Sequence, residues 1–224
     1  MTDASTTTIT LTVDDRTIQA PAGSSVLAAC LAADIYIPHL CWMESDTPDE
    51  APASCRLCFV EIEGFKEPVT ACSVVVENGM TMRTDTEAVR DLQKTALKLL
   101  FSVHRVDCKN CPANKACALQ GIAKFLKAGL TCKPFERTLK EPEVDSRHPV
   151  FDYYPNRCVL CGICVRVCGR RNGQSQLSLA GRGFDTVVGY FGSDAASAED
   201  CRNCKACLEA CPTGALVEKT TDGG

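Results

Sequence analysis

The sequence has few large apolar side chains and no long apolar run. Only 6% of its 224 residues are aromatic, and Trp42 is the single tryptophan. Such a chain is poorly suited to one large core. Several small modules held together by metal fit better, because small domains bury too little surface to be stable unaided. No apolar stretch approaches the roughly 18–20 residues of a membrane-spanning helix, so we expect no direct membrane span.

Basic residues are not gathered as nucleic-acid binding requires. The formal net charge is −4, and no run of Lys or Arg is longer than Arg170-Arg171. These features disfavour a nucleic-acid partner. The first ten residues, MTDASTTTIT, lack the basic region and apolar core of a signal peptide. We therefore expect a cytoplasmic protein.

Motifs for nucleotides and substrates are missing as well. No G-x-G-x-x-G follows an expected strand and no Walker A motif occurs; Gly181-Arg182-Gly183 is too short for either. No nucleophile–base arrangement is evident. We expect no catalytic residues, no active site of the chain's own, and no site for NAD or flavin.

Cysteine, in contrast, is abundant. The chain has seventeen cysteines, many of them in groups with two, three or five residues between neighbours. Disulfides are typical of secreted small proteins, but here there is no export signal and the number is odd. Short spacing places several sulfurs around one point, which indicates metal ligation in a reducing compartment.

The first module predicts two strands, a helix and a cysteine-bearing loop. Residues 8–13 and 16–20 alternate like strands around a turn at Asp14-Asp15, and Ser24 or Ser25 is expected to cap a helix that reaches about Ala33. This order is typical of a β-grasp ferredoxin. Four cysteines here satisfy a [2Fe–2S] cluster: Cys41, Cys55, Cys58 and Cys72. A structural zinc site with the same four thiolates is the alternative.

A helical segment follows. Residues 84–87 predict a capping box in which Thr84 bonds the N–H of Glu87, with a helix running to about Phe101. A second helix is expected over 116–127, with Gly129 as its C′ residue. The apolar residues that repeat at helical spacing in the first helix are Val89, Leu92, Ala96, Leu99, Leu100 and Val103.

The second ligand group combines one histidine with three cysteines. His104 stands at the end of the first of these helices, four positions before a cysteine triplet. We predict that a [4Fe–4S] cluster is held by His104, Cys108, Cys111 and Cys117. Neutral imidazole carries less charge than thiolate, so it should raise the potential of the cluster relative to four cysteines. Zinc bound by the same four side chains is the alternative.

The third and fourth groups form an internal repeat. Each run reads C-x2-C-x2-C-x3-C, the second followed by Pro212 and the first by Gly169, with a strand expected at 186–190 between them. In bacterial two-cluster ferredoxins the fourth cysteine of each run ligates the other cluster. We therefore predict two crossed [4Fe–4S] sets: Cys158, Cys161, Cys164 and Cys211 in one, and Cys201, Cys204, Cys207 and Cys168 in the other.

Two cysteines and two histidines remain outside these sets. Cys30 lies in an apolar helical stretch and is expected in the core, while Cys132 is expected to be buried or incidental. We expect His39 and His148 to be structural or solvent-facing. The predicted fold is α+β, in four parts: a β-grasp [2Fe–2S] domain at 1–82, a helical one-His, three-Cys segment at 83–132, a connector at 133–156, and a double [4Fe–4S] ferredoxin-like domain at 157–224.

With these motifs in hand, the chain resembles a known family. The order of the modules is similar to the N-terminal iron–sulfur region of the G-type large iron–sulfur subunit of complex I. It also resembles the diaphorase small subunit of NAD-reducing hydrogenases and the accessory region of [FeFe]-hydrogenases. The resemblance runs from about Thr8 to Glu218, carried by CRLCFVEIEG at 55–64, ACALQG at 116–121 and RCVLCGICVRVC at 157–168. In two departures, Ala53 stands where glycine is common, and the stretch between Cys41 and Cys55 is a few residues longer.

The resemblance implies a subunit of an NAD(P)-linked oxidoreductase complex. Such a subunit relays single electrons between a flavin/NAD(P)H-binding subunit and a catalytic reductase, hydrogenase or formate dehydrogenase subunit. The residues leave two further hypotheses open. One is a free, diffusible polyferredoxin, which differs only in assembly state. The other is a zinc-bound interaction module with no redox role.

Overall fold

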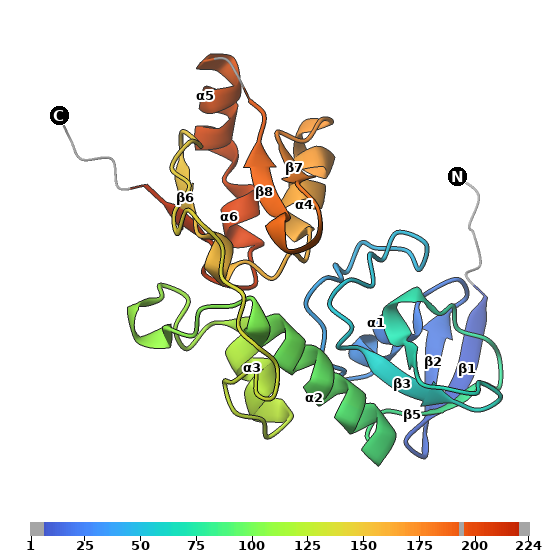
Figure 1. Ribbon diagram of the computed structural model, residues 1–224. Coiled ribbons are helices and arrows are strands. Elements are labelled where there is room, and N and C mark those ends of the chain that lie inside the picture. Colours follow the sequence, from blue (N-terminus) through green and yellow to red (C-terminus); the bar gives the residue numbers. More distant parts are fainter. Residues whose placement is uncertain (1–6, 193–194, 220–224) are drawn as a thin grey trace, which may run out of the picture. The chain divides into compact units, whose positions relative to one another are not determined.

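The computed structural model describes residues 7–192 and 195–219. These residues fall into two compact units that divide between Leu97 and Lys98, inside one long helix. Figure 1 shows the order of the elements within each unit. No helix in the described ranges has the length and apolar character needed to cross a lipid bilayer.

The first unit is built on a five-stranded mixed sheet with the strand order β2-β1-β5-β3-β4. Its strands are β1 (Thr8–Val13), β2 (Arg16–Pro21), β3 (Phe59–Ile62), β4 (Val69–Thr70) and β5 (Thr81–Arg83). β1 and β2 form the predicted hairpin, with Asp14 (φ 47°) and Asp15 (φ 66°) both left-handed in its turn. Two left-handed turn residues match the twist of the flanking strands. β1 pairs parallel with β5, which brings distant parts of the chain together.

Helix α1 (Val26–Ala32) packs against this sheet (Figure 1). Ser25 is its N-cap, and the Ser25 hydroxyl accepts the N–H of Ala28 at 3.1 Å. Val26, Leu27 and Cys30 are fully buried in the core that α1 shares with β1. The capped helix predicted here is confirmed, as is the core position of Cys30.

Helix α2 (Glu87–Ser102) begins differently from the prediction. Thr86, not Thr84, caps it: the Thr86 hydroxyl accepts the N–H of Val89 at 3.2 Å. Thr84 instead donates its hydroxyl to the Asp14 carboxylate, which also accepts the Thr84 N–H at 2.8 Å. The predicted capping box at Thr84 is therefore wrong, because the hairpin turn competes for the same threonine.

The buried face of α2 is also rotated from the predicted one. Leu92 and Leu99 are 36% and 50% exposed, whereas Gln93 is fully buried. The Gln93 amide donates to the Phe59 carbonyl at 3.1 Å and accepts from Arg90 at 2.9 Å, so its burial leaves no polar group unsatisfied. The apolar residues buried on this helix are Val89, Ala96, Leu97 and Phe101.

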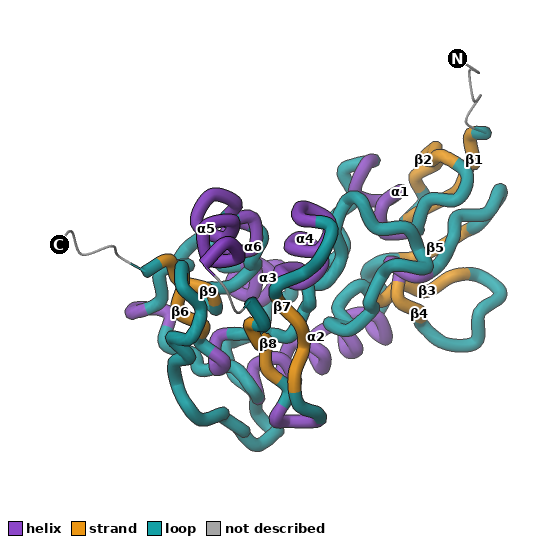
Figure 2. The backbone as a smooth tube through the Cα atoms, turned by 90° about the horizontal axis from the view of Figure 1, so that it is seen from above, coloured by secondary structure: helices purple, strands orange, loops and turns teal. Residues whose placement is uncertain are grey.

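The second unit contains four helices and two separate two-stranded ladders among its described residues (Figure 2). The helices are α3 (Ala118–Phe125), α4 (Ile163–Asn172), α5 (Ala195–Cys204) and α6 (Ala206–Glu209). The antiparallel ladders pair β6 (Phe151–Tyr153) with β9 (Leu216–Glu218) and β7 (Leu177–Ala180) with β8 (Val187–Tyr190). The strand expected at 186–190 is thus present.

Two expectations for this unit are corrected. Helix α3 ends at Phe125, and Lys127 (φ 50°) takes the left-handed position, while the Ala128 N–H closes the end on the Ala123 carbonyl at 2.9 Å. Gly129 is therefore not the C′ residue. The segment expected to be a connector without regular structure contains β6. Its partner β9 lies more than sixty residues later, so no local periodicity revealed it.

Candidate iron–sulfur sites

The four N-terminal cysteines lie together in the first unit, and all four are buried. Cys72 sits on the 3-10 turn η1 (Ala71–Ser73), and Cys55 and Cys58 flank a tight loop in which Arg56 is left-handed (φ 52°). The Cys41 and Cys55 sulfurs are 3.4 Å apart. The loop thus gathers four sulfurs from three distant stretches of sequence.

The four thiols form two hydrogen-bonded pairs, and in each pair one thiol is shifted toward thiolate and the other away from it. A hydrogen bond from Cys55 lowers the pKa of Cys41 to about 5, and the same bond, with burial, raises the pKa of Cys55. A bond with Cys58 likewise lowers the pKa of Cys72, while that bond and burial raise the pKa of Cys58. Thiolate is the form that binds metal. A dry set of four converging sulfurs fits an iron–sulfur cluster.

Ala53 opens this loop in a left-handed conformation, with φ at 46°. Such a conformation costs an L-residue other than glycine roughly 1–2 kcal/mol. Glycine, which has no Cβ atom, would adopt this conformation without that cost.

A second site lies in the other unit, where His104, Cys108, Cys111 and Cys117 line one small cavity. His104 follows the end of α2, Cys108 begins the 3-10 turn η2 (Cys108–Asn110), and Cys117 is the residue before α3. Short turns therefore bring together four side chains spread over fourteen residues.

His104 is held as a neutral imidazole. Burial lowers its pKa to about 4, helped by the nearby positive charges of Arg157 and Arg137 and opposed by a hydrogen bond to the Arg157 backbone. Its Nδ1 atom is buried and has no hydrogen-bond partner among the described residues. A buried, unsatisfied nitrogen costs about 1–3 kcal/mol. A metal ligand bond would remove that cost, so the histidine fits the predicted cluster.

Gly214 forms one wall of this cavity. A Cβ atom built on Gly214 would lie 2.6 Å from the Cys111 sulfur, closer than real contacts allow. The neighbouring Pro212 carbonyl accepts the first N–H of α3, from Ala118, at 3.0 Å. The backbone after Cys211 is therefore packed directly against the one-His, three-Cys site.

The remaining eight cysteines surround two further cavities, in the crossed arrangement. One cavity is lined by Cys158, Cys161, Cys164 and Cys211. The other is lined by Cys168, Cys201, Cys204 and Cys207. Helix α4 connects them, since Cys164 and Cys168 lie one turn apart on it and face different cavities.

Gly169, which follows Cys168, lies inside α4. Proline there would break the helix, which accounts for the departure from the Cys-Pro pattern of the second run. Within the described part of the chain, no group of three or more Cys, His, Asp or Glu side chains is arranged to hold a single metal ion.

Several N–H groups point at these sulfurs. The Gln176 N–H lies 3.3 Å from the Cys168 sulfur and the Asn172 amide 3.7 Å from it. The Leu160 N–H lies 3.4 Å from the Cys158 sulfur. Burial raises the pKa of Cys158, and a hydrogen bond from Tyr153 works against that rise. Such contacts to cluster sulfurs set reduction potentials.

Sequence reasoning missed three residues at these sites: His148, Tyr153 and Gly214. His148 is 4% exposed and lines the cavity of Cys168, so it is not solvent-facing. Tyr153 lines the neighbouring cavity from β6. The alternation of Phe151 and Tyr153 was the available signal. Cys30 and Cys132 are both buried outside the four sets, and burial raises the pKa of Cys30 to about 12.

Three family models match the chain. The "2Fe-2S iron-sulfur cluster binding domain" matches residues 6–87. The "NADH-ubiquinone oxidoreductase-G iron-sulfur binding region" matches residues 93–129. The "4Fe-4S binding domain" matches residues 197–217. The chain therefore contains a 2Fe-2S domain and 4Fe-4S binding regions in a mixed α/β fold.

Curated relatives are larger oxidoreductase subunits. The second G-type subunit of NADH-quinone oxidoreductase from Rhizobium meliloti is 35% identical over 215 residues, covering 93% of this chain and 24% of the relative. NADPH-Fe(3+) oxidoreductase subunit alpha of Geobacter sulfurreducens is 32% identical, covering 94% and 24%. NADP-reducing hydrogenase subunit HndD of Solidesulfovibrio fructosivorans is 32% identical, covering 94% and 36%. The chain thus spans about a quarter to a third of the length of these relatives.

One solved structure matches along almost its whole length. A chain of NAD+-reducing [NiFe]-hydrogenase in the H2-reduced state superposes with a TM-score of 0.79 at 30% identity, covering 95% of this chain and 88% of that chain. The chain belongs to the family of iron–sulfur proteins that includes the G-type subunit of NADH-quinone oxidoreductase and this chain of NAD+-reducing [NiFe]-hydrogenase.

Proposed function

We propose that this chain is an electron-transfer subunit with one [2Fe–2S] and three [4Fe–4S] clusters. It relays single electrons between a flavin/NAD(P)H-binding subunit and a catalytic reductase, hydrogenase or formate dehydrogenase subunit. The observation that carries the proposal is the grouping of sixteen side chains into four sets. One set is a cluster of buried sulfurs, and each of the other three lines its own cavity.

The ligands follow from these sets. Cys41, Cys55, Cys58 and Cys72 hold the [2Fe–2S] cluster. His104, Cys108, Cys111 and Cys117 hold one [4Fe–4S] cluster, and the two crossed cysteine sets hold the others. The five-stranded order β2-β1-β5-β3-β4, with α1 packed on it, supports a β-grasp domain around the first site. The fold boundaries near 82, 132 and 156 are part of the same proposal.

Bound clusters of these types accept and release single electrons. The chain's own residues do the rest. Thiolates and the neutral His104 hold iron, and the burial of eight of the fifteen cysteine ligands limits the access of water to their sulfurs. N–H groups such as those of Leu160 and Gln176 stabilise charge on sulfur. Together these features support a path for single electrons.

The partners follow from the relatives, whose names describe NADH-, NADPH- or NADP-linked oxidoreductases. We place the chain in such a complex and in the cytoplasm, where seventeen free cysteines stay reduced. Hydride transfer to or from NAD(P)H moves two electrons at once, whereas each iron–sulfur cluster carries one. A chain of four one-electron sites suits that position.

Anaerobic native purification tests the proposal. Iron and sulfide analysis should give about fourteen iron atoms per chain, EPR should show both cluster types, and mass spectrometry should identify a flavin subunit and a catalytic redox subunit. A brown protein that elutes alone would favour a diffusible polyferredoxin. A colourless, zinc-loaded protein would overturn the redox function altogether.

A further inference from the structure

We propose that His148 donates an N–H hydrogen bond to the [4Fe–4S] cluster of Cys168, Cys201, Cys204 and Cys207, and thereby raises its reduction potential. The proposal rests on the proposed function, because it needs that cluster to be bound. His148 is outside all four ligand sets. It belongs to the site because it is buried and lines the same cavity as these cysteines.

His148 is built into the cavity wall. It is 4% exposed and lines the cavity together with Cys168, Cys201 and Cys207. Its ring stacks on Phe151, with the ring centres 3.6 Å apart and the planes at 15°. Tyr190 meets it edge-on at 4.3 Å. Two aromatic neighbours therefore hold the imidazole in one orientation beside the sulfurs.

One nitrogen of this ring is already occupied. The backbone N–H of Val150 donates to His148 Nδ1 at 3.1 Å. A nitrogen that accepts a hydrogen bond carries no proton, so the proton of the neutral ring is on Nε2. The hydrogen bond that the structure gives this ring is the one at Nδ1, which leaves the Nε2 proton as the donor in question. The residue is 4% exposed and lines the cavity, so water has little access to this N–H, and cluster sulfur is an acceptor that the cavity would supply.

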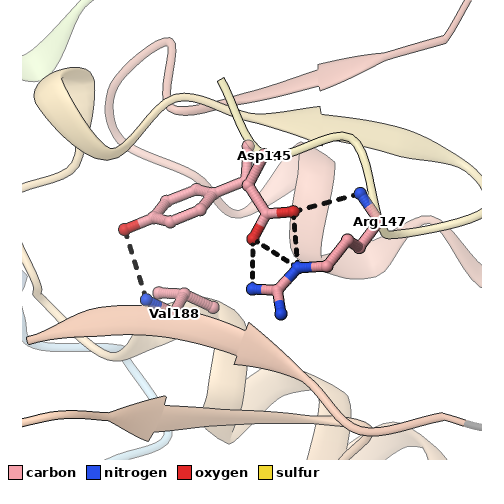
Figure 3. A network of polar contacts seen from close by, with 4 residues as sticks. Asp145, Arg147 and Val188 are labelled. Atoms are coloured by element: carbon pink, nitrogen blue, oxygen red, sulfur yellow. Dashed lines mark hydrogen bonds and ion pairs between the residues drawn. The ribbon is translucent and has the colours of Figure 1, made fainter. Parts of the chain in front are cut away.

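The segment before His148 is fixed as well (Figure 3). The Asp145 carboxylate accepts the Arg147 backbone N–H at 3.1 Å and its guanidinium at 2.6–3.1 Å. Asp145 and Tyr153 also exchange two backbone hydrogen bonds, at 2.8 and 2.9 Å. The chain is therefore pinned on both sides of His148.

The same segment serves the neighbouring cavity. The Tyr153 hydroxyl oxygen accepts the Val188 N–H at 3.2 Å (Figure 3), and burial raises the pKa of Cys158 while a hydrogen bond from Tyr153 works against that rise. His148 and Tyr153 are thus five residues apart, and each lines a different cavity. This pairing gives the experiment an internal reference, because Tyr153 belongs to the other cluster.

A donor near a cluster changes the potential with a definite sign. Reduction adds negative charge, so an N–H donor stabilises the reduced cluster more than the oxidised one. Removal of the donor must therefore lower the midpoint potential. A roughly tenfold change in the ratio of reduced to oxidised cluster corresponds to about 59 mV for one electron.

The test is an EPR-monitored redox titration of the anaerobically purified full chain, or of its complex. His148→Phe keeps an aromatic ring but removes the donor, and should lower one [4Fe–4S] midpoint by about 59 mV, a tenfold shift. Asn172→Leu removes the 3.7 Å contact to the Cys168 sulfur and should lower that same midpoint. Tyr153→Phe should lower a different one. His148→Gln retains an N–H donor, so its midpoint should stay close to that of the wild-type protein.

Phe151→Leu is the packing control, because it removes the stacked ring and leaves the donor. An unshifted midpoint in His148→Phe, or an equal shift in Phe151→Leu, overturns the proposal. If His148→Phe fails to load the cluster, pulsed EPR of wild-type protein containing 15N-histidine decides. Weak 15N coupling to that cluster supports the hydrogen bond, and its absence refutes it. Wild-type protein without [4Fe–4S] signals would instead overturn the proposed function.

Discussion

The α-carbon of Gly214 lies so close to the Cys111 sulfur that a Cβ atom there would come within 2.6 Å of it. Gly214 is three residues after Cys211, which lines a different cavity. Between them, the Thr213 hydroxyl donates to the Arg157 carbonyl at 2.8 Å, next to Cys158. Residues 211–214 are thus a common wall of two cysteine cavities.

Gly214→Ala should damage the one-His, three-Cys site. The added methyl group must displace either the Cys111 sulfur or the backbone of residue 214. A Cys111 sulfur that ligates a cluster could not move away without loss of that ligand bond. We expect loss of one [4Fe–4S] cluster, about four iron atoms per chain, with the [2Fe–2S] signal retained. Iron analysis and EPR check this result. Gly121→Ala is the matched control, since its Cβ would meet nothing within 4 Å. Full iron content in Gly214→Ala would contradict the close packing.

His104→Cys should keep a cluster and lower its potential. A thiolate adds a negative charge where the imidazole is neutral, and extra charge on the ligand set disfavours reduction. The redox-titrated spectrum of one cluster should move to lower potential while the others stay fixed. His39→Gln serves as the control, because His39 is hydrogen-bonded to the Ile37 carbonyl and lies outside the four ligand sets. No shift in His104→Cys would count against ligation by His104.

Cys168→Ala and Cys211→Ala should each affect the cluster of the other cysteine run. Cys168 belongs to the first run but lines the cavity of Cys201, Cys204 and Cys207. Cys211 belongs to the second run but lines the cavity of the first. Each variant should therefore damage mainly the cluster held by the opposite run. EPR in backgrounds that already lack Cys158 or Cys201 assigns the lost signal. Damage confined to a variant's own run would refute the crossed assignment.

Thr86→Ala should destabilise the start of α2. It leaves the Val89 N–H without its side-chain acceptor, and loss of an N-cap costs about 1 kcal/mol. Urea unfolding followed by circular dichroism should show a midpoint at a lower urea concentration. Thr86→Ser, which keeps the hydroxyl, should return the midpoint to the wild-type value. If Thr86→Ala leaves the transition unchanged, the N-cap contributes nothing measurable.

Ala53→Gly should stabilise the first unit by roughly 1 kcal/mol, because glycine adopts a positive φ without the steric cost that alanine carries. Thermal unfolding of the loaded protein measures this gain. Ala51→Gly, outside the left-handed residues, should bring a loss of similar or smaller size. A lower melting temperature in Ala53→Gly would show that the alanine methyl packs more favourably than its backbone strain costs.

Sequence reasoning located the elements whose signals are local. The Asp14-Asp15 turn, the Ser25 cap and the strand near Val187 all depend on neighbouring residues, and all are present. The spacing of the cysteines likewise predicted which of them the structure brings together. Membership of the family is confirmed by the comparisons.

What sequence reasoning missed depends on partners far along the chain. Thr84 was taken for a helix cap because its bond to Asp14 joins residues seventy positions apart. Gln93 is outside the apolar repeat predicted for α2, and its burial depends on the distant Phe59 carbonyl, which accepts its amide in the core. His148 was expected to be structural or solvent-facing, and its place beside Cys168 could not be foreseen because it arises only when the chain returns for β6 to pair with β9.

The crossing of cysteines on α4 has a consequence for how the protein matures. Cys164 and Cys168 belong to one helix but to different cavities, and each cavity needs a cysteine from both runs. In the proposed ligand sets, neither cluster has all four ligands until both cysteine runs are folded. Assembly of either proposed cluster should therefore wait until both ends of this domain have been synthesised and brought together.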